Sequence, residues 1–232
     1  MKGVAFDLEG TCVDLEEIHF TAYSQAFAEQ GIIMSPLEIA RLPNAMGGGA
    51  RFIFQAMLSK FPDFQLEIAR ERKRIHFVEL FNATTLAPRP GLIEFIESQL
   101  SHGCTIAIGS TTSRDFGTDI LIKTGLDRFF PPAVCVFRED VSEIKPAGEV
   151  FARTAHILHV VGNDQLVFED SVVGIQAAHQ AGSSVIAIPA PFALDEDRIS
   201  LLQEAGPVAL FEDWEAVPRL FHPAQHNDST GT

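Results

Sequence analysis

Short apolar runs alternate along the chain with stretches of helical periodicity. The first run, residues 4–8, is short and bounded by glycines, which favours a central parallel strand over a helix. Similar runs follow at residues 104–110, 133–137, 165–170 and 184–189, with a weaker run at 207–211. The helical stretches between them cover residues 91–103, 114–125, 147–160 and 173–182. This alternation predicts an α/β fold: a doubly wound parallel sheet with right-handed crossovers and helices on both faces.

Residues 15–85 break the alternation, because their pattern is helical throughout and contains no convincing strand. The helical stretches in this part cover residues 16–31, 36–42, 50–61 and 66–83. We therefore expect an all-helical cap domain over residues 15–85, inserted into a core formed by residues 1–14 and 86–221. Two short linkers would hinge it over the active-site edge of the sheet. Residues 222–232 are polar and lack periodicity, which predicts a flexible tail.

Composition and charge narrow the class of partner. With 46% hydrophobic and 21% charged residues among 232, the chain has the composition of an ordinary folded protein. Its net charge of −14 repels nucleic-acid phosphates and anionic membrane surfaces, so we expect neither as a partner. The same charge opposes a phosphorylated substrate unless the site supplies local cations. Composition leaves the oligomeric state open.

The spacing of the cysteines and the N-terminal residues indicate the cellular compartment of the protein. Cys12, Cys104 and Cys135 are widely spaced and form no CxxC pattern, so neither a disulfide framework nor a zinc site is indicated. The N-terminus lacks the charged start and apolar stretch of a signal peptide, and no apolar run reaches the length of a membrane span. We expect a soluble protein of the reducing cytoplasm.

Carboxylates stand where two of the predicted strands end. Asp7 closes the first run and is followed by a Glu-Gly-Thr turn, and Glu169 and Asp170 close the fourth. One such aspartate on its own would be read as a turn cap. Because the carboxyl ends of parallel strands meet at one edge of the sheet, we expect these acids to lie close together. Buried acids next to one another repel unless a cation lies between them. Oxygen ligands of this kind favour Mg²⁺.

Hydroxyl groups and a lysine complete the set. Ser110, Thr111 and Thr112 end the second predicted strand, where a hydroxyl and free N–H groups suit a phosphoryl oxygen. Lys145 precedes Pro146, which forces the lysine out of helical geometry. Alone, a Ser-Thr-Thr turn indicates a helix cap and a lone lysine a surface charge. Together, acid, hydroxyl, lysine and acid pair are the parts of a metal-assisted phosphoryl transfer through an aspartyl-phosphate.

At this point the sequence resembles a known family, the haloacid dehalogenase-like hydrolases, in the branch with a helical cap after the first strand. The motifs that carry the resemblance are DLEGT (7–11), GST (109–111), KPAGEVF (145–151) and EDSVVGIQAA (169–178). The resemblance implies a Rossmann-like core and a nucleophile at Asp7. It also implies Mg²⁺ held by the Asp7 side chain, by the backbone carbonyl of Glu9 and by Asp170, with Glu169 in support.

The resemblance further implies that Ser110, Thr111 and Lys145 hold the transferring phosphoryl group. Glu9 departs from the family pattern, since the phosphatases and phosphomutases usually have aspartate at this general acid and base. Glutamate keeps the carboxyl group but is longer by one methylene, and catalytic geometry is usually needed to within about 0.5 Å. Glu9 can work from a shifted rotamer, work slowly, or point elsewhere and leave a protein that binds without turnover. We expect the first.

Three residues of the predicted cap are candidates for substrate binding. Residues 42–55 contain three glycines followed by Arg51, a loop that could grip a second anionic group, although a surface arginine after a turn fits equally well. His19 and Lys73 are further candidates, and the spacing of His19 resembles the β-phosphoglucomutases.

The expected function is Mg²⁺-dependent hydrolysis of a small phosphorylated metabolite, a sugar phosphate or a phosphoglycolate-like acid. The alternatives are a phosphosugar mutase, which must keep water from its phosphoenzyme, and a catalytically weak phosphate-binding protein in which Glu9 has abolished turnover.

Overall fold

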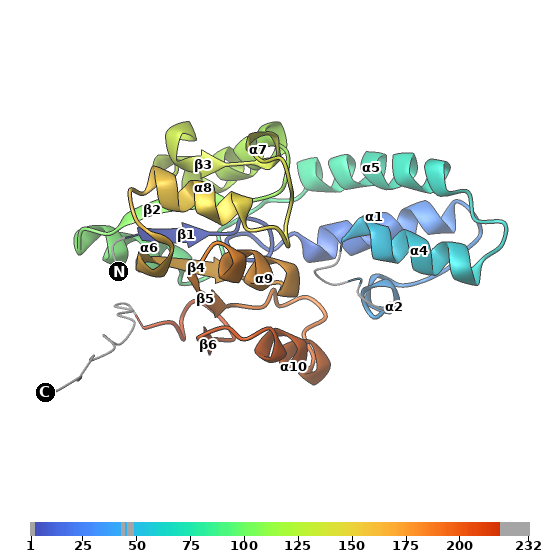
Figure 1. Ribbon diagram of the computed structural model, residues 1–232. Helices are drawn as coiled ribbons and strands as arrows, with labels where there is room; N and C mark the ends of the chain where they lie inside the picture. The colour runs from blue at the N-terminus through green and yellow to red at the C-terminus, as the bar shows by residue number, and fades with distance from the viewer. Residues whose placement is uncertain (1–2, 43–44, 46–48, 219–232) are drawn as a thin grey trace, which may run out of the picture.

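The computed structural model describes residues 3–42, 45 and 49–218. Its centre is a six-stranded parallel sheet in the order β3-β2-β1-β4-β5-β6 (Figure 1). The strands are β1 (Gly3–Phe6), β2 (Thr105–Gly109), β3 (Cys135–Val136), β4 (Gln165–Glu169), β5 (Ser184–Ala187) and β6 (Ala209–Leu210). Every predicted apolar run overlaps one of these strands, so the predicted doubly wound parallel sheet is confirmed. The chain order reverses beside β1, so a site is expected at the carboxyl ends of β1 and β4.

Helices cover both faces of the sheet. They are α6 (Leu92–Ser101), α7 (Arg114–Thr124), α8 (Glu149–Ile157), α9 (Val172–Gln180) and α10 (Glu196–Glu204). Short 3₁₀ turns lie at Leu126–Arg128, Pro132–Val134, Arg138–Asp140 and Gly162–Asp164. Helix α10 was not among the predicted helices; its local signal is Asp195, whose side chain accepts the backbone N–H of Arg198 as an N-cap.

Alternation along the strands divides the core into two layers. Val4 and Phe6 of β1 point into a buried cluster that includes apolar side chains of α6 and α7. Ala5 points the other way, into a cluster that includes Val150 of α8 and Ile175 of α9. Because successive strand residues face opposite sides, one short strand contributes to both layers. Strand β1 is buried along its whole length, which explains its continuous apolar sequence.

Residues 16–83 form a helical part at one end of the sheet (Figure 1). It contains α1 (Glu16–Ala28), α2 (Pro36–Ala40), α4 (Ala50–Lys60) and α5 (Leu66–Ala83), and no strand among its described residues. Side chains of all four helices, including Phe27, Ile39, Met57 and Ala69, build a third buried cluster. This part therefore has an apolar core of its own. Its helices agree with the predicted pattern, while the domain limits at 15 and 85 stay a prediction.

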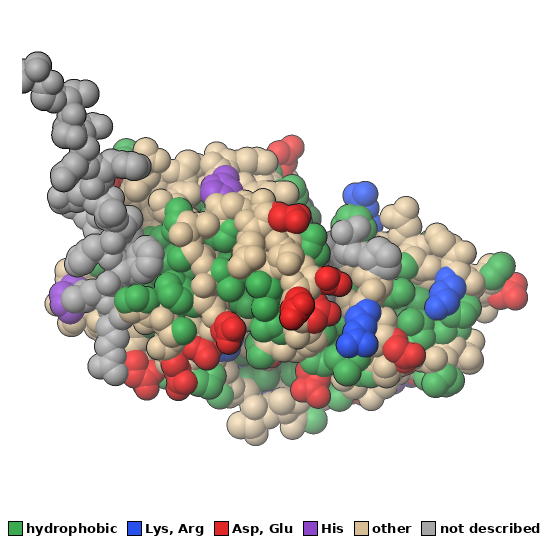
Figure 2. Space-filling view, turned by 90° about the horizontal axis from the view of Figure 1, so that it is seen from below, with side chains coloured by type: hydrophobic (Ala, Val, Ile, Leu, Met, Phe, Trp, Pro, Cys, Tyr) green, Lys and Arg blue, Asp and Glu red, His purple; other side chains and the backbone are tan. Residues whose placement is uncertain are grey.

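The surface carries the negative charge that the composition indicates. Figure 2 shows one face, on which acidic side chains are spread along the molecule and Lys and Arg stand out mainly at the helical end. Within the described ranges, none of the helices is both long and apolar enough to cross a bilayer. The predicted tail at 222–232 and the loop positions 43–44 and 46–48 lie outside the described residues.

Candidate active site

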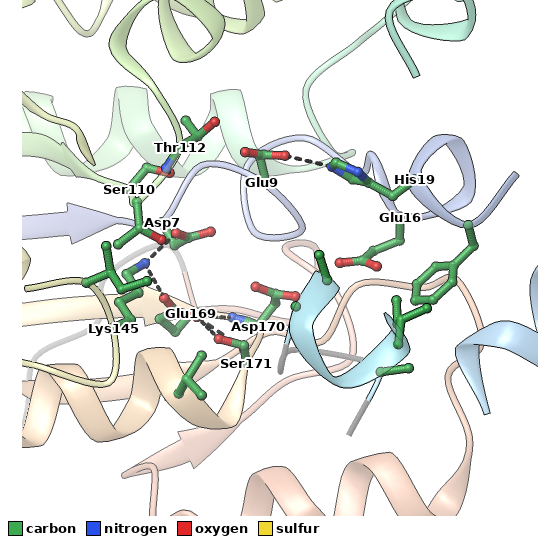
Figure 3. Close-up of a pocket in the computed structure, with 18 of the residues that line it drawn as sticks. Asp7, Glu9, Glu16, His19, Ser110, Thr112, Lys145, Glu169, Asp170 and Ser171 are labelled. Atoms are coloured by element: carbon green, nitrogen blue, oxygen red, sulfur yellow. Dashed lines mark hydrogen bonds and ion pairs between the residues drawn. The ribbon is translucent and has the colours of Figure 1, made fainter. Parts of the chain in front are cut away.

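The carboxyl ends of β1 and β4 bring three acids together. Phe6 pairs in register with Phe168, and the N–H of Asp7 donates to the Phe168 carbonyl at 3.0 Å. Asp7 therefore leaves the sheet beside Glu169 and Asp170. Ligand oxygens of these three carboxylates all lie within 4.8 Å of one another, and all three residues are buried (Figure 3).

Lys145 reaches this acidic edge from the loop before α8. Its Nζ atom lies 2.5 Å from Oδ1 of Asp7 and 2.6 Å from Oε1 of Glu169. Burial lowers the pKa of Lys145, but the negative charges of the two acids outweigh this and hold the pKa above its usual value. The side chain is only 6% exposed. Lys145 is thus a fixed positive charge beside the candidate nucleophile.

One lysine does not balance three buried carboxylates. Burial, together with the charges of Glu169 and Asp170, raises the pKa of Asp7 well above its usual value despite Lys145. Burial and the charge of Glu169 likewise raise the pKa of Asp170 to about 8. A cation with oxygen ligands would favour the ionised form of both acids. The donor set consists only of carboxylate oxygens, which fits Mg²⁺.

Glu169 is held in place by its own neighbours. Its Oε2 atom accepts the backbone N–H groups of Asp170 at 3.0 Å and Ser171 at 3.1 Å, and the Ser171 hydroxyl at 3.0 Å. Gly174 of α9 leaves room for it, because a Cβ atom there would lie 1.8 Å from the Glu169 carboxyl carbon. The other carboxylate oxygen of Glu169 contacts Lys145, so Glu169 is placed to support the cluster. Asp7 and Asp170 keep more lone pairs free to bind a metal ion.

Asp170 has two further neighbours. The Thr11 hydroxyl lies 3.5 Å from its Oδ1 atom, and Nη2 of Arg198 lies 3.4 Å from its Oδ2 atom. Gly10 passes so close that a Cβ atom there would lie 2.4 Å from Oδ2, and its φ of +83° also favours glycine. The Gly-Thr pair after Glu9 thus packs against Asp170, which gives a structural reason for these two residues.

Two buried arginines support the loops around the acids, and sequence reasoning missed both. Nη1 of Arg198 donates to the carbonyls of Ala190 and Phe192, each at 3.1 Å. Nη1 of Arg89 donates to the Gly10 carbonyl at 2.8 Å. The Arg89 contact joins segments 79 residues apart, so no local pattern in the sequence indicates it. The Arg198 contacts span only eight and six residues, but they depend on how the loop before α10 folds back.

Ser110 and Thr111 follow β2 at the same edge. The Ser110 N–H donates to the Val136 carbonyl at 3.0 Å, and its Oγ atom accepts the Thr112 N–H at 3.3 Å. Ser110, Thr111 and Thr112 all line the cavity in front of Asp7. The residues whose hydroxyl groups are predicted to bind the phosphoryl group therefore line the same cavity as the acids and Lys145.

Glu9 points toward the helical part and away from Asp7 (Figure 3). Its Oε2 atom lies 3.0 Å from Nε2 of His19 on α1, and Nδ1 of His19 lies 2.8 Å from Nζ of Lys73 on α5. The imidazole ring stacks on Phe77, with ring centroids 4.2 Å apart. Three of the predicted residues thus form one chain of contacts that ends at the acid beside the nucleophile.

The pKa shifts of His19 and Glu9 indicate which atoms carry protons in this series of contacts. Burial lowers the pKa of His19, and the charge of Lys73 lowers it further. Burial raises the pKa of Glu9, but contacts with His19, Thr112 and Lys73 together hold it below its usual value. A neutral His19 with its proton on Nε2 donates to an ionised Glu9 and accepts from Lys73 through Nδ1, which satisfies all three groups.

The acids and the helical part enclose a cavity of about 420 Å³. Nine of the ten predicted site residues line it: Asp7, Glu9, His19, Lys73, Ser110, Thr111, Lys145, Glu169 and Asp170. Arg51 does not; it is exposed, with its guanidinium over the ring of Phe52 at 5.4 Å. The part of Arg51 in substrate binding therefore stays a prediction, while its neighbours Gly49 and Ala50 line the cavity. Sequence reasoning also overlooked Glu16, which lines the cavity.

The chain is similar to several known proteins. The family model for haloacid dehalogenase-like hydrolases matches residues 4–188. Protein CbbY of Rhodobacter capsulatus is 29% identical over 206 residues, 85% of this chain and 89% of that protein. The phosphorylated carbohydrates phosphatase of Thermotoga maritima is 29% identical over 221 residues, 93% and 96% of the two chains. The crystal structure of a haloacid dehalogenase-like protein of unknown function from Agrobacterium tumefaciens superposes with a TM-score of 0.81 at 22% identity, covering 93% of this chain and 95% of that one.

Proposed function

The chain belongs to the haloacid dehalogenase-like hydrolases, and we propose that it is a Mg²⁺-dependent phosphatase that hydrolyses a small phosphorylated carbohydrate through a phosphoryl-aspartate at Asp7. The observation that carries this proposal is the contact of Asp7 with Lys145 beside Glu169 and Asp170, in a cavity that Ser110 also lines. The kinship with a phosphorylated carbohydrates phosphatase supports the substrate class.

In the first step, a carboxylate oxygen of Asp7 attacks phosphorus and the bond to the leaving oxygen breaks. Lys145 and the Ser110 hydroxyl are placed to bind the phosphoryl oxygens during the transfer. The Asp7 and Asp170 carboxylates and the Glu9 carbonyl would hold Mg²⁺, which when bound offsets the negative charge that gathers on the phosphoryl group. In the second step, water attacks the phosphorus atom and Asp7 is restored.

Glu9 would serve these steps as acid and base. Its lowered pKa in contact with His19 favours the ionised form, which suits the activation of the attacking water. Protonation of the leaving oxygen requires Glu9 to carry a proton and to turn from His19 toward the substrate. The contact with His19 therefore describes a state before that turn.

The test is a screen of phosphorylated metabolites for phosphate release, with Mg²⁺ or with EDTA, by the wild type and by Asp7→Asn. We expect Mg²⁺-dependent release by the wild type and a fall of at least about 10³-fold in the variant. Asp63→Asn, at an exposed acid of the helical part, is the matched control.

Three outcomes would contradict the proposal. Absence of release from every compound, with binding that depends on Mg²⁺, indicates the phosphate-binding alternative. A positional isomer in place of inorganic phosphate, detected by ³¹P NMR, indicates the phosphosugar mutase. Equal release by Asp7→Asn excludes Asp7 as the nucleophile.

A further inference from the structure

Arg198 is a buried cation beside the cluster of acids that the proposed chemistry does not use. It lies on α10, and only 8% of its surface is exposed. Its Nη2 atom forms an ion pair with Oδ2 of Asp170 at 3.4 Å. Arg198 is not among the residues that line the cavity in front of Asp7. Any effect of Arg198 on the reaction must therefore pass through Asp170.

The guanidinium group of Arg198 is held by acceptors that are fixed themselves. Its Nη1 atom donates to the carbonyl oxygens of Ala190 and Phe192, each at 3.1 Å. Ala190 is fully buried, and the ring of Phe192 stacks on Phe20 of α1 with ring centroids 5.6 Å apart. A planar guanidinium with nitrogens engaged on two sides keeps its direction. Arg198 therefore presents its charge to Oδ2 of Asp170 in one position.

The backbone of Gly10 covers the same oxygen of Asp170. A Cβ atom at Gly10 would lie 2.4 Å from Oδ2 and 3.0 Å from Oδ1, so the turn after β1 packs closest to Oδ2. On Oδ1, the Thr11 hydroxyl at 3.5 Å is a weak, neutral donor that leaves a lone pair free. Oδ2 is thus enclosed by backbone and by a cation, whereas Oδ1 remains available to a metal ion.

The other two acids of the cluster are limited in a similar way. Lys145 contacts Oδ1 of Asp7 and Oε1 of Glu169 (Figure 3). The Oε2 atom of Glu169 accepts three further hydrogen bonds. In the described part of the chain, one oxygen of Asp7 and one of Asp170 have no cation contact, and both oxygens of Glu169 are engaged. Each carboxylate can therefore offer at most one oxygen to a metal ion.

Mg²⁺ and Ca²⁺ differ in how they use carboxylates. Mg²⁺ requires nearly octahedral geometry, keeps several waters and is usually bound through one or two carboxylates together with substrate phosphate. Ca²⁺ takes about six to eight oxygen ligands, and one carboxylate often supplies two of them. A site in which each acid offers a single oxygen suits Mg²⁺ better than Ca²⁺.

We propose that Arg198 is a positioning residue that engages Oδ2 of Asp170, limits this carboxylate to one metal-binding oxygen, and so raises the preference of the site for Mg²⁺ over Ca²⁺. This inference rests on the proposed Mg²⁺-dependent function and adds a determinant of its metal selectivity. Without the guanidinium group, Asp170 can turn and bind Ca²⁺ through both oxygens. Loss of the positive charge strengthens the binding of both divalent ions, so the ratio of their dissociation constants reports the geometry alone.

The test measures the dissociation constants of Mg²⁺ and Ca²⁺ for the full-length protein, by isothermal titration calorimetry with each chloride salt alone. We expect Arg198→Met to lower the ratio Kd(Ca²⁺)/Kd(Mg²⁺) at least about tenfold, through tighter binding of Ca²⁺. Arg198→Lys keeps the charge but lacks the planar fork, so its ratio should fall at least about threefold. If Arg198→Met does not fold, Arg198→Lys decides alone.

Leu202→Ala is the matched control. Leu202 is buried about one turn further along α10 and packs in the cluster that includes Val150 and Ile175. Its truncation weakens the packing of the same helix and leaves the Arg198 guanidinium in place, so the ratio should equal that of the wild type. An equal fall of the ratio in Leu202→Ala would assign the effect to helix packing and overturn the inference.

Asp170→Asn separates this inference from the proposed function. If the wild type binds Mg²⁺, Asp170→Asn weakens this binding at least about tenfold, and the Arg198 variants keep the wild-type ratio, the role of Arg198 is wrong and the Mg²⁺ site stands. If the wild type binds no Mg²⁺, or Asp170→Asn binds it as tightly, the proposed metal site fails and the inference fails with it.

Discussion

The carboxylate of Glu9 lies 3.0 Å from Nε2 of His19, so the acid beside the candidate nucleophile is held by the first helix of the helical part. The longer glutamate spans the distance from the turn after β1 to α1. A substrate that draws Glu9 toward its leaving oxygen must break this contact. The position of α1 and the protonation chemistry of the site are therefore connected through one side chain.

Glu9→Asp is expected to lower kcat, because the site is arranged around the longer acid. One methylene less withdraws the carboxylate from His19, while productive geometry is needed to within about 0.5 Å. We expect a fall of about 10- to 100-fold in kcat, and a larger fall, about 10²- to 10⁴-fold, for Glu9→Gln, which keeps the length and loses the acid. Steady-state kinetics on any substrate found in the screen will measure both. A rise in kcat for Glu9→Asp would show that the longer side chain is a handicap.

Lys145→Met is expected to destabilise the protein as well as inactivate it. The change leaves Asp7 and Glu169 buried without their cation, and breaking a buried ion pair in this way costs about 3–5 kcal/mol. The loss should be largest at pH 8 in EDTA and smaller at pH 5, because burial raises the pKa of Asp7 and lets it take up a proton. Urea unfolding curves will measure the free energy, with exposed Lys60→Met as control. Equal losses for the two variants would contradict the assigned role.

Gly174→Ala tests whether the position of Glu169 matters for metal use. Alanine normally stabilises a helix, but here its Cβ atom would lie 1.8 Å from the Glu169 carboxyl carbon and displace that side chain. We expect at least about a tenfold rise in the Mg²⁺ concentration that gives half-maximal activity. Gln176→Ala, exposed on the same helix, should behave as wild type. Unchanged Mg²⁺ dependence in Gly174→Ala would show that Glu169 has no role in the metal site.

Glu16 is expected to make stability fall as pH rises. Its pKa is about 7 in the folded protein against an ordinary value of 4.5, so the folded state holds the proton more tightly than the unfolded state. The stability that this proton confers is full below about pH 4.5 and is lost as pH rises through 7.

Glu16→Gln should therefore be more stable than wild type at pH 8, by about 1–3 kcal/mol after allowance for solvent screening, and equal to it near pH 4.5. Unfolding curves in EDTA at the two pH values will show this difference. Glu17→Gln should give no pH-dependent change. A constant difference between Glu16→Gln and wild type at both pH values would mean that Glu16 titrates normally.

Much of the fold could be predicted from the sequence, because local patterns carry it. The continuous burial of β1 imposes its apolar run, and the same holds for β4. The helices of residues 16–83 follow their periodicity closely. The convergence of Asp7 with Glu169 and Asp170 also follows from the sequence, since parallel strands place their carboxyl ends at one edge.

The remaining features of the site depend on contacts between distant segments. The contact of Arg198 with Asp170 depends on where α10 packs. The contact of Glu9 with His19 required the position of α1 relative to the sheet. No residue spacing contains that information, and for the same reason Glu16 was overlooked.

The most direct test of the proposed mechanism is to trap the phosphorylated enzyme. Wild-type protein is mixed with ³²P-labelled acetyl phosphate and Mg²⁺, quenched in acid, and the label is mapped to a peptide. We expect label on the peptide that contains Asp7, released by hydroxylamine as an acyl phosphate is, and none in Asp7→Asn. Mg²⁺-dependent hydrolysis without label on that peptide, or equal labelling of Asp7→Asn, would contradict a phosphoryl-aspartate at Asp7.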